Sequence, residues 1–248
     1  VRDRLGGQLK FFISGGAALN PEIGNFFMAL GINLLQGYGQ TEASPLISAN
    51  RPGRIKIETV GPVVSGVDMK IADDGEILVR GDLLMKGYWR DEAATAAVIQ
   101  NGWLHTGDLG EVDQEGFISI TGRKKDIIVN SGGDNIAPGR VEALLTIEPE
   151  IEQAMVDGDK RPWLAAVIVP SEEVRTLASS PDALATMVGE AVDRANSRLS
   201  QLERVRRFII ADEPFSTENG QMTATLKVRR HIVRVLYEDR LAALYPQK

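Results

Sequence analysis

Apolar and polar positions follow strand and helix periods in turn at the start of the chain. An apolar run at residues 9–14 predicts a buried strand, and residues 32–35 predict a second, short one. Between them, Asn20 and Pro21 supply an N-cap and a first-turn proline, so a helix is expected over residues 21–30. This strand–helix–strand order favours a parallel α/β layer, whose ligands lie beyond the carboxyl ends of the strands.

From residue 51 onward the pattern changes to short strands joined by tight turns. The expected strands are residues 67–71, 76–80 and 117–121. A hairpin turn, Asp-Asp-Gly, occupies residues 73–75, and a helix capped by Asp91 is expected at residues 93–99. We therefore expect a small β-rich subdomain.

After residue 123 strands and helices mix again. The expected strands are residues 126–129, 153–157, 165–170 and 205–210, and the expected helices are residues 138–147, 181–199 and 228–244. By composition alone, the run Lys124-Lys125-Asp126 is a solvated charge cluster. The whole pattern predicts an α/β and α+β fold. Its expected parts are the end of a truncated large α/β subdomain at 1–50, the β-rich subdomain at 51–123 and an α+β domain at 124–248.

Composition describes a globular chain with an acidic balance. The chain has 248 residues, 43% of them hydrophobic, which is enough for one large or two ordinary domains. A net charge of −6 argues against a nucleic-acid partner, because binding to phosphates needs a basic surface. Cysteine is absent, which excludes disulfides and thiolate metal sites and suits a reducing cytoplasm. No apolar run is long enough to span a bilayer, so any membrane contact is expected to be peripheral. The expected location is the cytoplasm, with membrane association left open.

A seven-residue run carries the groups that a nucleotide site needs: Gln36-Gly37-Tyr38-Gly39-Gln40-Thr41-Glu42. Its glycines let the backbone pass close to a ligand. Tyr38 can stack on a base, Thr41 can bond a phosphate oxygen, and Glu42 can bind Mg²⁺ through a hard oxygen ligand. In isolation, the same run is equally well explained as an ordinary turn after an apolar strand.

Four further runs occur with it in one order along the chain. They are Ser-Gly-Gly-Ala-Ala at 14–18, His-Thr-Gly-Asp at 105–108, Gly-Arg-Lys-Lys-Asp at 122–126 and Thr-Ala-Thr-Leu-Lys at 223–227. Together the five runs resemble the adenylate-forming superfamily, which includes acyl-CoA synthetases, luciferases and peptide-synthetase adenylation domains. Residues 101–125 are similar to the signature segment of long-chain fatty acyl-CoA synthetases.

The resemblance implies the C-terminal part of an ATP-dependent long-chain fatty acid–CoA ligase. Such an enzyme forms an acyl adenylate and then a thioester, with ATP, Mg²⁺, CoA and a fatty acid as its small-molecule partners. A ligase that transfers the acyl group to an acyl carrier protein is the alternative. The family's Ser/Thr/Gly-rich triphosphate loop is not found in this sequence, which also opens on Val1 without Met. We therefore expect the fragment alone to be an inactive nucleotide-binding module; its oligomeric state stays open.

The resemblance also assigns catalytic roles. Lys227 is expected to bridge the fatty acid carboxylate and the α-phosphate, with Thr41 and Glu42 as the other catalytic residues and Glu42 as the metal ligand. Asp108 would accept both ribose hydroxyls, and Arg123 would reach the ribose or a phosphate. Without the resemblance, Lys227 is an ordinary surface lysine and Asp108 a turn residue.

The remaining expected nucleotide contacts are Gly16, Ala17, Ala18, Gln36, Gly37 and Tyr38. The loop with Gly132 and Gly133 resembles the family loop that swings inward for thioester formation and lets the CoA thiol pass close to the backbone; the alternative is a glycine-rich hairpin. Lys125 stands at the family's pivot position, so it is the expected hinge of a mobile C-terminal domain.

Other polar clusters have no assigned chemistry. His105 and His231, the two histidines, form neither a metal-ligand pattern nor a nucleophile–base pair. The remaining basic clusters, Arg204, Arg206, Arg207, Arg229, Arg230 and Arg234, are expected on solvated faces. A contact from one of these arginines to a CoA phosphate stays open.

Overall fold

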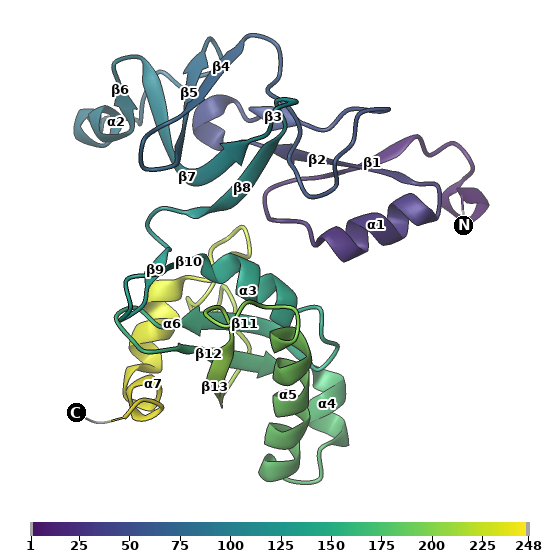
Figure 1. The fold of residues 1–248 in the computed structure, drawn as a ribbon, viewed down its shortest axis with the longest axis vertical. Helices are drawn as coiled ribbons and strands as arrows, with labels where there is room; N and C mark the ends of the chain where they lie inside the picture. The colour runs from purple at the N-terminus through teal and green to yellow at the C-terminus, as the bar shows by residue number, and fades with distance from the viewer. Residues whose placement is uncertain (1, 247–248) are drawn as a thin grey trace. The chain divides into compact units, whose positions relative to one another are not determined.

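The computed structural model describes residues 2–246. Two compact units form along the chain, Val1–Lys125 and Asp126–Lys248, coloured purple to teal and teal to yellow in Figure 1. Each unit has its own sheets and its own hydrophobic core. The further division of the first unit at residue 50 stays a prediction.

A three-stranded sheet opens the first unit. Its elements are the 3₁₀-helix η1 (Arg2–Leu5), β1 (Phe11–Ser14), α1 (Pro21–Ala29), β2 (Asn33–Tyr38) and β3 (Ser48–Ala49). β1 and β2 pair in parallel, and β3 pairs antiparallel with β2. The Asn20 side chain caps α1 by accepting a hydrogen bond from Glu22 N at 2.6 Å. The expected parallel α/β layer is therefore confirmed.

The expectation that β1 is buried is wrong. β1 is the edge strand of its sheet, and one of its faces is open: Phe11 is 38% and Ile13 is 74% exposed. The exposed apolar residues continue onto α1, where Phe26 is 59% exposed. An apolar run predicts that a strand is buried, but it does not predict which other element packs against the strand and buries it.

A five-stranded antiparallel sheet makes up the rest of the first unit. Its elements are the 3₁₀-helix η2 (Thr41–Ala43), β4 (Val67–Ile71), β5 (Glu76–Gly81), α2 (Glu92–Val98), β6 (Ile99–Gln100), β7 (Trp103–Val112) and β8 (Ile118–Arg123). The strand order is β4-β5-β7-β6, with β8 also paired to β7. The long strand β7, which the sequence did not predict, therefore joins the sheet together. Its inward residue Leu104 packs with Ile77, Val79 and Ile118 in the core of this unit.

The second unit is an α+β layer structure, as expected. Its elements are β9 (Ile128–Val129), β10 (Asn135–Ile136), α3 (Pro138–Leu145), β11 (Ile151–Asp157), β12 (Leu164–Pro170), α4 (Glu172–Leu177), α5 (Pro181–Asn196), β13 (Val205–Ile210), α6 (Arg230–Leu236) and α7 (Glu238–Ala243). β9 and β10 form a small hairpin, while β12 lies between β11, its antiparallel neighbour, and β13, its parallel one.

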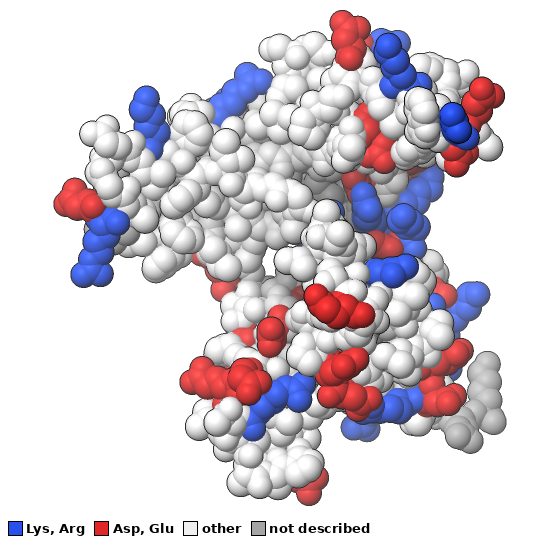
Figure 2. Space-filling view, turned by 180° about the vertical axis from the view of Figure 1, so that it is seen from behind, with Lys and Arg blue, Asp and Glu red and all other residues white. Residues whose placement is uncertain are grey.

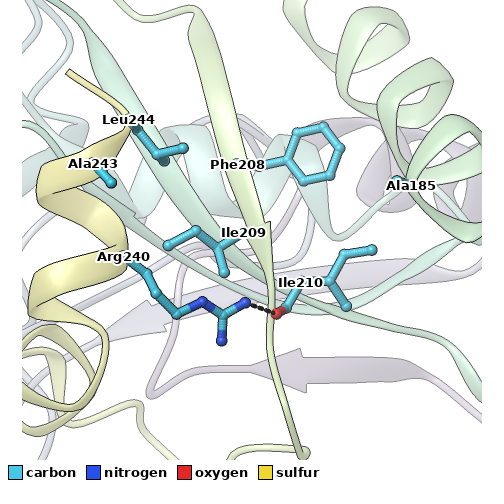
Figure 3. A pocket seen from close by; sticks show the side chains of 7 residues that line it. All are labelled: Ala185, Phe208, Ile209, Ile210, Arg240, Ala243 and Leu244. Atoms are coloured by element: carbon cyan, nitrogen blue, oxygen red, sulfur yellow. Dashed lines mark hydrogen bonds between the residues drawn. The ribbon is translucent and has the colours of Figure 1, made fainter. Parts of the chain in front are cut away.

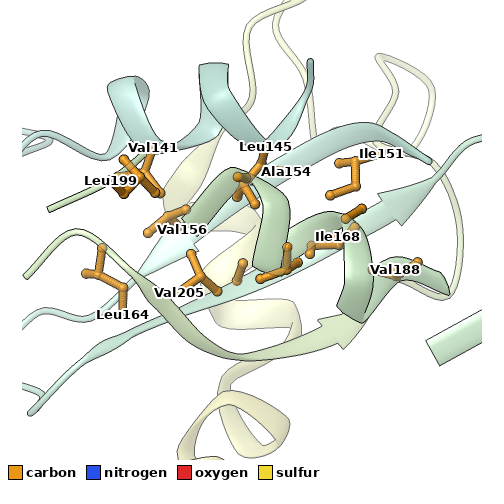
Figure 4. Close-up of a cluster of buried hydrophobic side chains, with 14 of the residues drawn as sticks. Val141, Leu145, Ile151, Ala154, Val156, Leu164, Ile168, Val188, Leu199 and Val205 are labelled. Atoms are coloured by element: carbon orange, nitrogen blue, oxygen red, sulfur yellow. The ribbon is translucent and has the colours of Figure 1, made fainter. Parts of the chain in front are cut away.

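Strand β12 is buried on both faces. Leu164, Ala166 and Ile168 face a core formed with α3 and α5, part of which Figure 4 shows. Ala165 and Val167 face a second core formed with α6 and α7. A continuous apolar run is what a strand covered by helices on both sides requires.

Two expectations for the C-terminal segment are wrong. The single helix expected at 228–244 is broken at Tyr237 into α6 and α7. The Tyr237 ring is buried, and its hydroxyl accepts a hydrogen bond from Asp212 N at 2.9 Å, which fixes the chain at the break. Arg230, expected on a solvated face, is half-buried and paired with Glu142. An arginine without a partner is usually exposed to solvent, but pairing with Glu142 allows Arg230 to be partly buried against β11.

Charged side chains of both signs are mixed over the surface. In Figure 2, Lys and Arg stand beside Asp and Glu, and broad uncharged areas lie between the clusters. Many of these charges form ion pairs, such as Arg80 with Asp68 and Arg240 with Asp212. Among residues 2–246, no helix combines the length and apolar character that crossing a bilayer requires.

Candidate functional site

Three of the residues expected to contact a nucleotide meet in the first unit. Asp108 lies in β7 opposite Arg123, the last residue of β8, and Tyr38 is the last residue of β2. The Tyr38 hydroxyl donates to Asp108 Oδ2 at 2.7 Å, and Arg123 Nε donates to Asp108 Oδ1 at 2.7 Å. Asp108 is only 5% exposed. Strand pairing therefore builds a buried carboxylate between a phenol and a guanidinium.

The surroundings of this cluster keep its phenol protonated. Burial, followed by the charge of Asp108, raises the pKa of Tyr38 well above its ordinary value of 10.0. Tyr38 therefore donates to Asp108 throughout the neutral range. A carboxylate has about four acceptor sites, more than the bonds from Tyr38 and Arg123 given above, so a vicinal diol can bond to the same group.

A second buried carboxylate, Glu76, supports the segment that carries Asp108. Glu76 Oε1 accepts a hydrogen bond from Gly107 N at 2.9 Å, while His105 Nδ1 and Lys124 Nζ each lie 3.1 Å from Oε2. Burial alone would raise the pKa of Glu76, but the hydrogen bonds from Gly107, His105 and Lys124 outweigh it and lower the pKa. Glu76 was not predicted as a site residue from the sequence, although an acidic residue at the start of an apolar strand, directly after a hairpin turn, is a usable signal.

The same network fixes the end of the first unit. Lys124 N donates to Gly107 O at 2.9 Å, and Lys124 Nζ also pairs with Asp74 at 2.5 Å. Lys124 is thus held to β7 and to the β4–β5 turn. The next residue, the expected hinge Lys125, is exposed.

The side-chain amide of Gln36 is hydrogen-bonded within the fold. Its Nε2 donates to Ile57 O at 2.5 Å, and its Oε1 lies 3.4 Å from Leu19 N as an acceptor. Gln36 is 6% exposed, so its amide closes the layer of β1, α1 and β2. The Gln36 carbonyl also accepts a hydrogen bond from Asn50 N at 2.8 Å, so both its side chain and its carbonyl are used by the fold.

The glycines and alanines near these strands have different uses. Gly16, Ala17 and Ala18 are exposed in the turn after β1, where Gly16 has a φ of +85°. At Gly37, a Cβ would lie 3.2 Å from Leu46 and 3.4 Å from Ser48 O, so this glycine serves the packing of β2 on β3. The backbone of the turn after β1 is thus accessible to a ligand, whereas Gly37 is needed for the close packing of β2 on β3.

Thr41 and Glu42 lie in η2. Thr41 is exposed, and Glu42 Oε1 accepts a hydrogen bond from the Tyr88 hydroxyl at 2.8 Å. That hydrogen bond raises the pKa of Tyr88. Among the described residues, no group of three or more acidic or histidine side chains is placed to hold a metal ion. Mg²⁺ that is bound to the phosphates of a substrate keeps several waters and needs only one or two carboxylates from the protein. The single carboxylate of Glu42 fits this mode of binding.

The other expected site residues belong to the second unit. Lys227 is exposed in a loop before α6, where Thr223 N donates to Lys227 O at 2.9 Å and Lys227 N to Thr223 Oγ1 at 3.1 Å. Gly132 and Gly133 lie between β9 and β10. There, Asn130 Oδ1 accepts from Gly132 N at 2.8 Å, and Gly133 has a φ of +89°.

An open groove in the second unit contains none of the expected site residues. It encloses about 400 Å³ and is lined by Ala185, Phe208, Ile209, Ile210, Arg240, Ala243 and Leu244 (Figure 3). The Arg240 guanidinium already donates to Ile210 O at 3.0 Å. The other lining residues are apolar, and the Arg240 guanidinium is already hydrogen-bonded within the protein. The groove therefore lacks the polar groups that a nucleotide needs and is not the candidate site.

Two family models match the chain. Residues 1–89 match the model described as AMP-binding enzyme, and residues 125–248 match the model described as AMP-binding enzyme C-terminal domain. The second match covers half of the chain.

Curated relatives include fatty acid ligases. A long-chain-fatty-acid–CoA ligase of Mycobacterium tuberculosis is 40% identical over 99% of this chain and 43% of its own length. A chloroplastic long-chain-fatty-acid–[acyl-carrier-protein] ligase of Arabidopsis thaliana is 33% identical over 96% of this chain and 36% of its own length. The chain thus spans less than half the length of these relatives.

A solved structure has the same fold over nearly the whole chain. The adenylation–carrier didomain of carboxylic acid reductase from Segniliparus rugosus, in complex with AMP, matches with a TM-score of 0.81 and 28% identity. The match covers 97% of this chain and 35% of the reductase chain.

We predict that Glu76→Gln destabilises the first unit by about 2 kcal/mol at neutral pH, because charge-assisted hydrogen bonds to Gly107, His105 and Lys124 are weakened. The interactions that lower the pKa of Glu76 contribute fully above its ordinary value of 4.5 and are lost as the pH falls through the lower folded-state value. Urea unfolding of both proteins from pH 7 to pH 3 should show the difference shrinking below pH 4.5.

The exposed pair Asp68–Arg80 on the neighbouring strands supplies the control. Asp68→Asn should change the stability by less than about 0.5 kcal/mol at any pH. Equal effects of the two substitutions would show that the network around Glu76 has no special weight.

Proposed function

The chain belongs to the AMP-binding enzyme family, and we propose that it is the C-terminal part of an ATP-dependent long-chain fatty acid–CoA ligase. In this reaction a fatty acid carboxylate attacks the α-phosphorus of ATP, which gives an acyl adenylate and releases pyrophosphate. The CoA thiol then loses its proton and attacks the acyl carbonyl, which gives a thioester and releases AMP. Neither step needs an oxidant or a reductant.

The buried carboxylate of Asp108 is the observation that carries the proposal. Asp108 is held from both sides by Tyr38 and Arg123 at 2.7 Å, so it is oriented before any ligand binds. We assign it to the two ribose hydroxyls of the nucleotide, which would bond to its remaining acceptor sites. The Tyr38 ring would then lie against the sugar or the base. The open turn Gly16-Ala17-Ala18 would line the base through its backbone.

Lys227 supplies the positive charge for adenylate formation in this proposal. Charge accumulates on the α-phosphate oxygens as the carboxylate attacks, and a fixed ammonium group stabilises it. The amine is exposed on a loop whose backbone is closed by Thr223, so it can reach a substrate without unfolding the unit. Thr41 would contact the phosphates, and Glu42 would bind the Mg²⁺ that accompanies ATP.

The second half-reaction needs a different loop at the same substrate. We assign the Gly132-Gly133 turn to the approach of the CoA thiol, because glycine leaves the backbone open there. A swing at Lys125 would exchange the two loops. The hydrogen bonds that fix Lys124 to Gly107 and Asp74 support a hinge that begins at the following residue.

An acyl carrier protein is the second candidate acceptor, favoured by the relative that is named for this acceptor. Its phosphopantetheine thiol has the same chemistry as CoA, so the adenylation half of the site would be unchanged. A cytoplasmic location and a peripheral membrane contact also stay predictions.

We predict that the full-length enzyme given ATP and a long-chain fatty acid releases AMP when CoA is added. Asp108→Asn should lower kcat/KM for ATP about 100-fold, because it removes the negative charge and replaces one acceptor oxygen with an NH₂ donor; losing a hydrogen bond to a charged group costs up to about 3 kcal/mol. AMP release should be followed with CoA and with holo-carrier protein in parallel. Release that depends on the carrier alone would replace CoA as the acceptor, and absence of pyrophosphate release with either would contradict the ligase assignment.

For the lysine, we predict that Lys227→Ala slows adenylate formation about 1000-fold, the scale of losing one preorganised charge contact. Thioester formation from a preformed acyl adenylate should be nearly unchanged, because Lys227 has no part in that step. ATP–pyrophosphate exchange and single-turnover thioester formation measure the two steps. The matched control is Lys160→Ala, which removes another exposed lysine of the same unit. Equal loss in both steps would disprove the role assigned to Lys227.

For the hinge, we predict that Lys125→Pro keeps one half-reaction and slows the other about 100-fold, since a misplaced catalytic group costs this much. Proline fixes φ near −65° and removes an N–H, so the chain at this residue is trapped in one conformation. Lys125→Ala is the control and should retain both half-reactions. Near-normal rates for a folded Lys125→Pro enzyme would move the pivot to Lys124 or Asp126.

A further inference from the structure

A half-buried ion pair joins α3 to α6 in the second unit. Arg230 NH1 and NH2 donate to the two carboxylate oxygens of Glu142 at 2.6 and 2.5 Å. The side chains are 26% and 16% exposed, respectively. Glu142 Oε1 also accepts from Val156 N at 2.7 Å, and Arg230 NH1 donates to Val156 O at 3.2 Å. The pair is therefore bound to the backbone of β11 on both sides.

Arg230 stands directly after the loop that carries Lys227. The base of this loop is closed where Arg229 N donates to Gln221 O at 2.8 Å, and a β-bridge joins Met222 to Val228. Lys227 is three residues before Arg230. A displacement of Arg230 would therefore shift the whole loop and its amine.

The other arm of the loop is held by the same strand. Gln153 Nε2 donates to Phe215 O at 3.0 Å, and Gln153 Oε1 accepts from Phe215 N at 2.7 Å. Met222 N donates to Ser216 O at 2.8 Å, which continues this anchor into the loop. Strand β11 thus fixes the incoming arm through Gln153 and the outgoing arm through the Glu142–Arg230 pair.

Glu142 belongs to the helix that follows the Gly132-Gly133 turn. Burial raises the pKa of the Glu142 carboxyl, and the facing guanidinium of Arg230 opposes the rise. The ion pair thus connects α3, which follows the glycine turn, to the loop that carries Lys227. The charge of Asp126, next to the expected hinge, acts on the same pair.

We propose that Glu142 and Arg230 are positioning residues for Lys227, and that their ion pair holds the loop 221–229 in the one place where its amine serves adenylate formation. The proposal rests on the function proposed above. Without the pair, the outgoing arm of the loop loses its ion-pair anchor to α3, and the loop keeps its Gln153 anchor, its own closing bonds and the packing of Met222 and Val228 on the core. Lys227 would then remain on the protein but would be displaced from the reacting atoms.

The first test uses half-reactions of the full-length enzyme. Glu142→Gln removes the charge and keeps the shape, and it should lower kcat of ATP–pyrophosphate exchange about 100-fold, the cost of a displacement near 1 Å. Thioester formation from a preformed acyl adenylate should change by less than about threefold, because Lys227 does not act in that step. Arg230→Lys, which keeps a charge but not the two parallel bonds, should fall between wild type and Glu142→Gln.

A double mutant separates positioning from general stability. Residues that act through one group are non-additive, so Glu142→Gln combined with Lys227→Ala should be no slower in exchange than Lys227→Ala alone. Multiplied losses in the double mutant would overturn the proposal, because they would show that Glu142 acts independently of Lys227.

The chain offers a matched control in a buried glutamate that has two arginine partners. Glu148 is 5% exposed in its side chain and pairs with Arg194 at 2.6 Å and Arg198 at 2.5 Å. Neither arginine belongs to the loop 221–229. Glu148→Gln should destabilise the unit to a similar extent but leave the ratio of the two half-reactions unchanged. A selective loss of adenylation in Glu148→Gln would also overturn the proposal.

Hydrogen–deuterium exchange tests the anchoring without any activity. In Glu142→Gln, peptides that cover residues 219–229 should exchange about tenfold faster, while those of β12 stay protected. Faster exchange spread evenly over the unit would count against a local anchor. If the wild-type enzyme formed no acyl adenylate at all, the proposed function would fail, and a local exchange effect would still establish the anchor.

Discussion

Buried carboxylates fix the geometry of both units, because an ionised oxygen away from water is tolerated only where donors surround it. In the first unit, Asp108 and Glu76 meet this condition by drawing donors from β2, β7 and β8 to the same place. In the second unit, Glu142 meets it with donors from β11 and α6. The candidate site and the loops that would serve it are therefore positioned by charges rather than by the apolar cores alone.

The sequence predicted the parts of the fold that depend on apolar patterning. The parallel pair β1–β2 and the strand β12 each follow from a short apolar run. What the pattern could not predict is which surface each run meets. Ile13 is exposed although its run is apolar, and Tyr237 breaks a segment with a helical pattern because its ring and hydroxyl have partners elsewhere.

The candidate site shows the same division. The resemblance singled out Tyr38, Asp108 and Arg123, and strand pairing brings them into contact. The partners of polar side chains were beyond reach, because they come from distant segments. The Gln36 amide is used by Ile57 and Leu19, and Arg230, one of several arginines on a basic stretch, finds Glu142 across 88 positions of sequence. Charge alone does not tell a solvated arginine from a paired one.

The open edge of β1 has a consequence for how this chain behaves in concentrated solution. An edge strand presents unpaired N–H and C=O groups, and here Phe11 and Ile13 add exposed apolar side chains beside them. Such an edge is a surface at which another strand can add by main-chain hydrogen bonds. Because the exposed side chains of Phe11 and Ile13 are apolar, any association at this edge would grow with protein concentration.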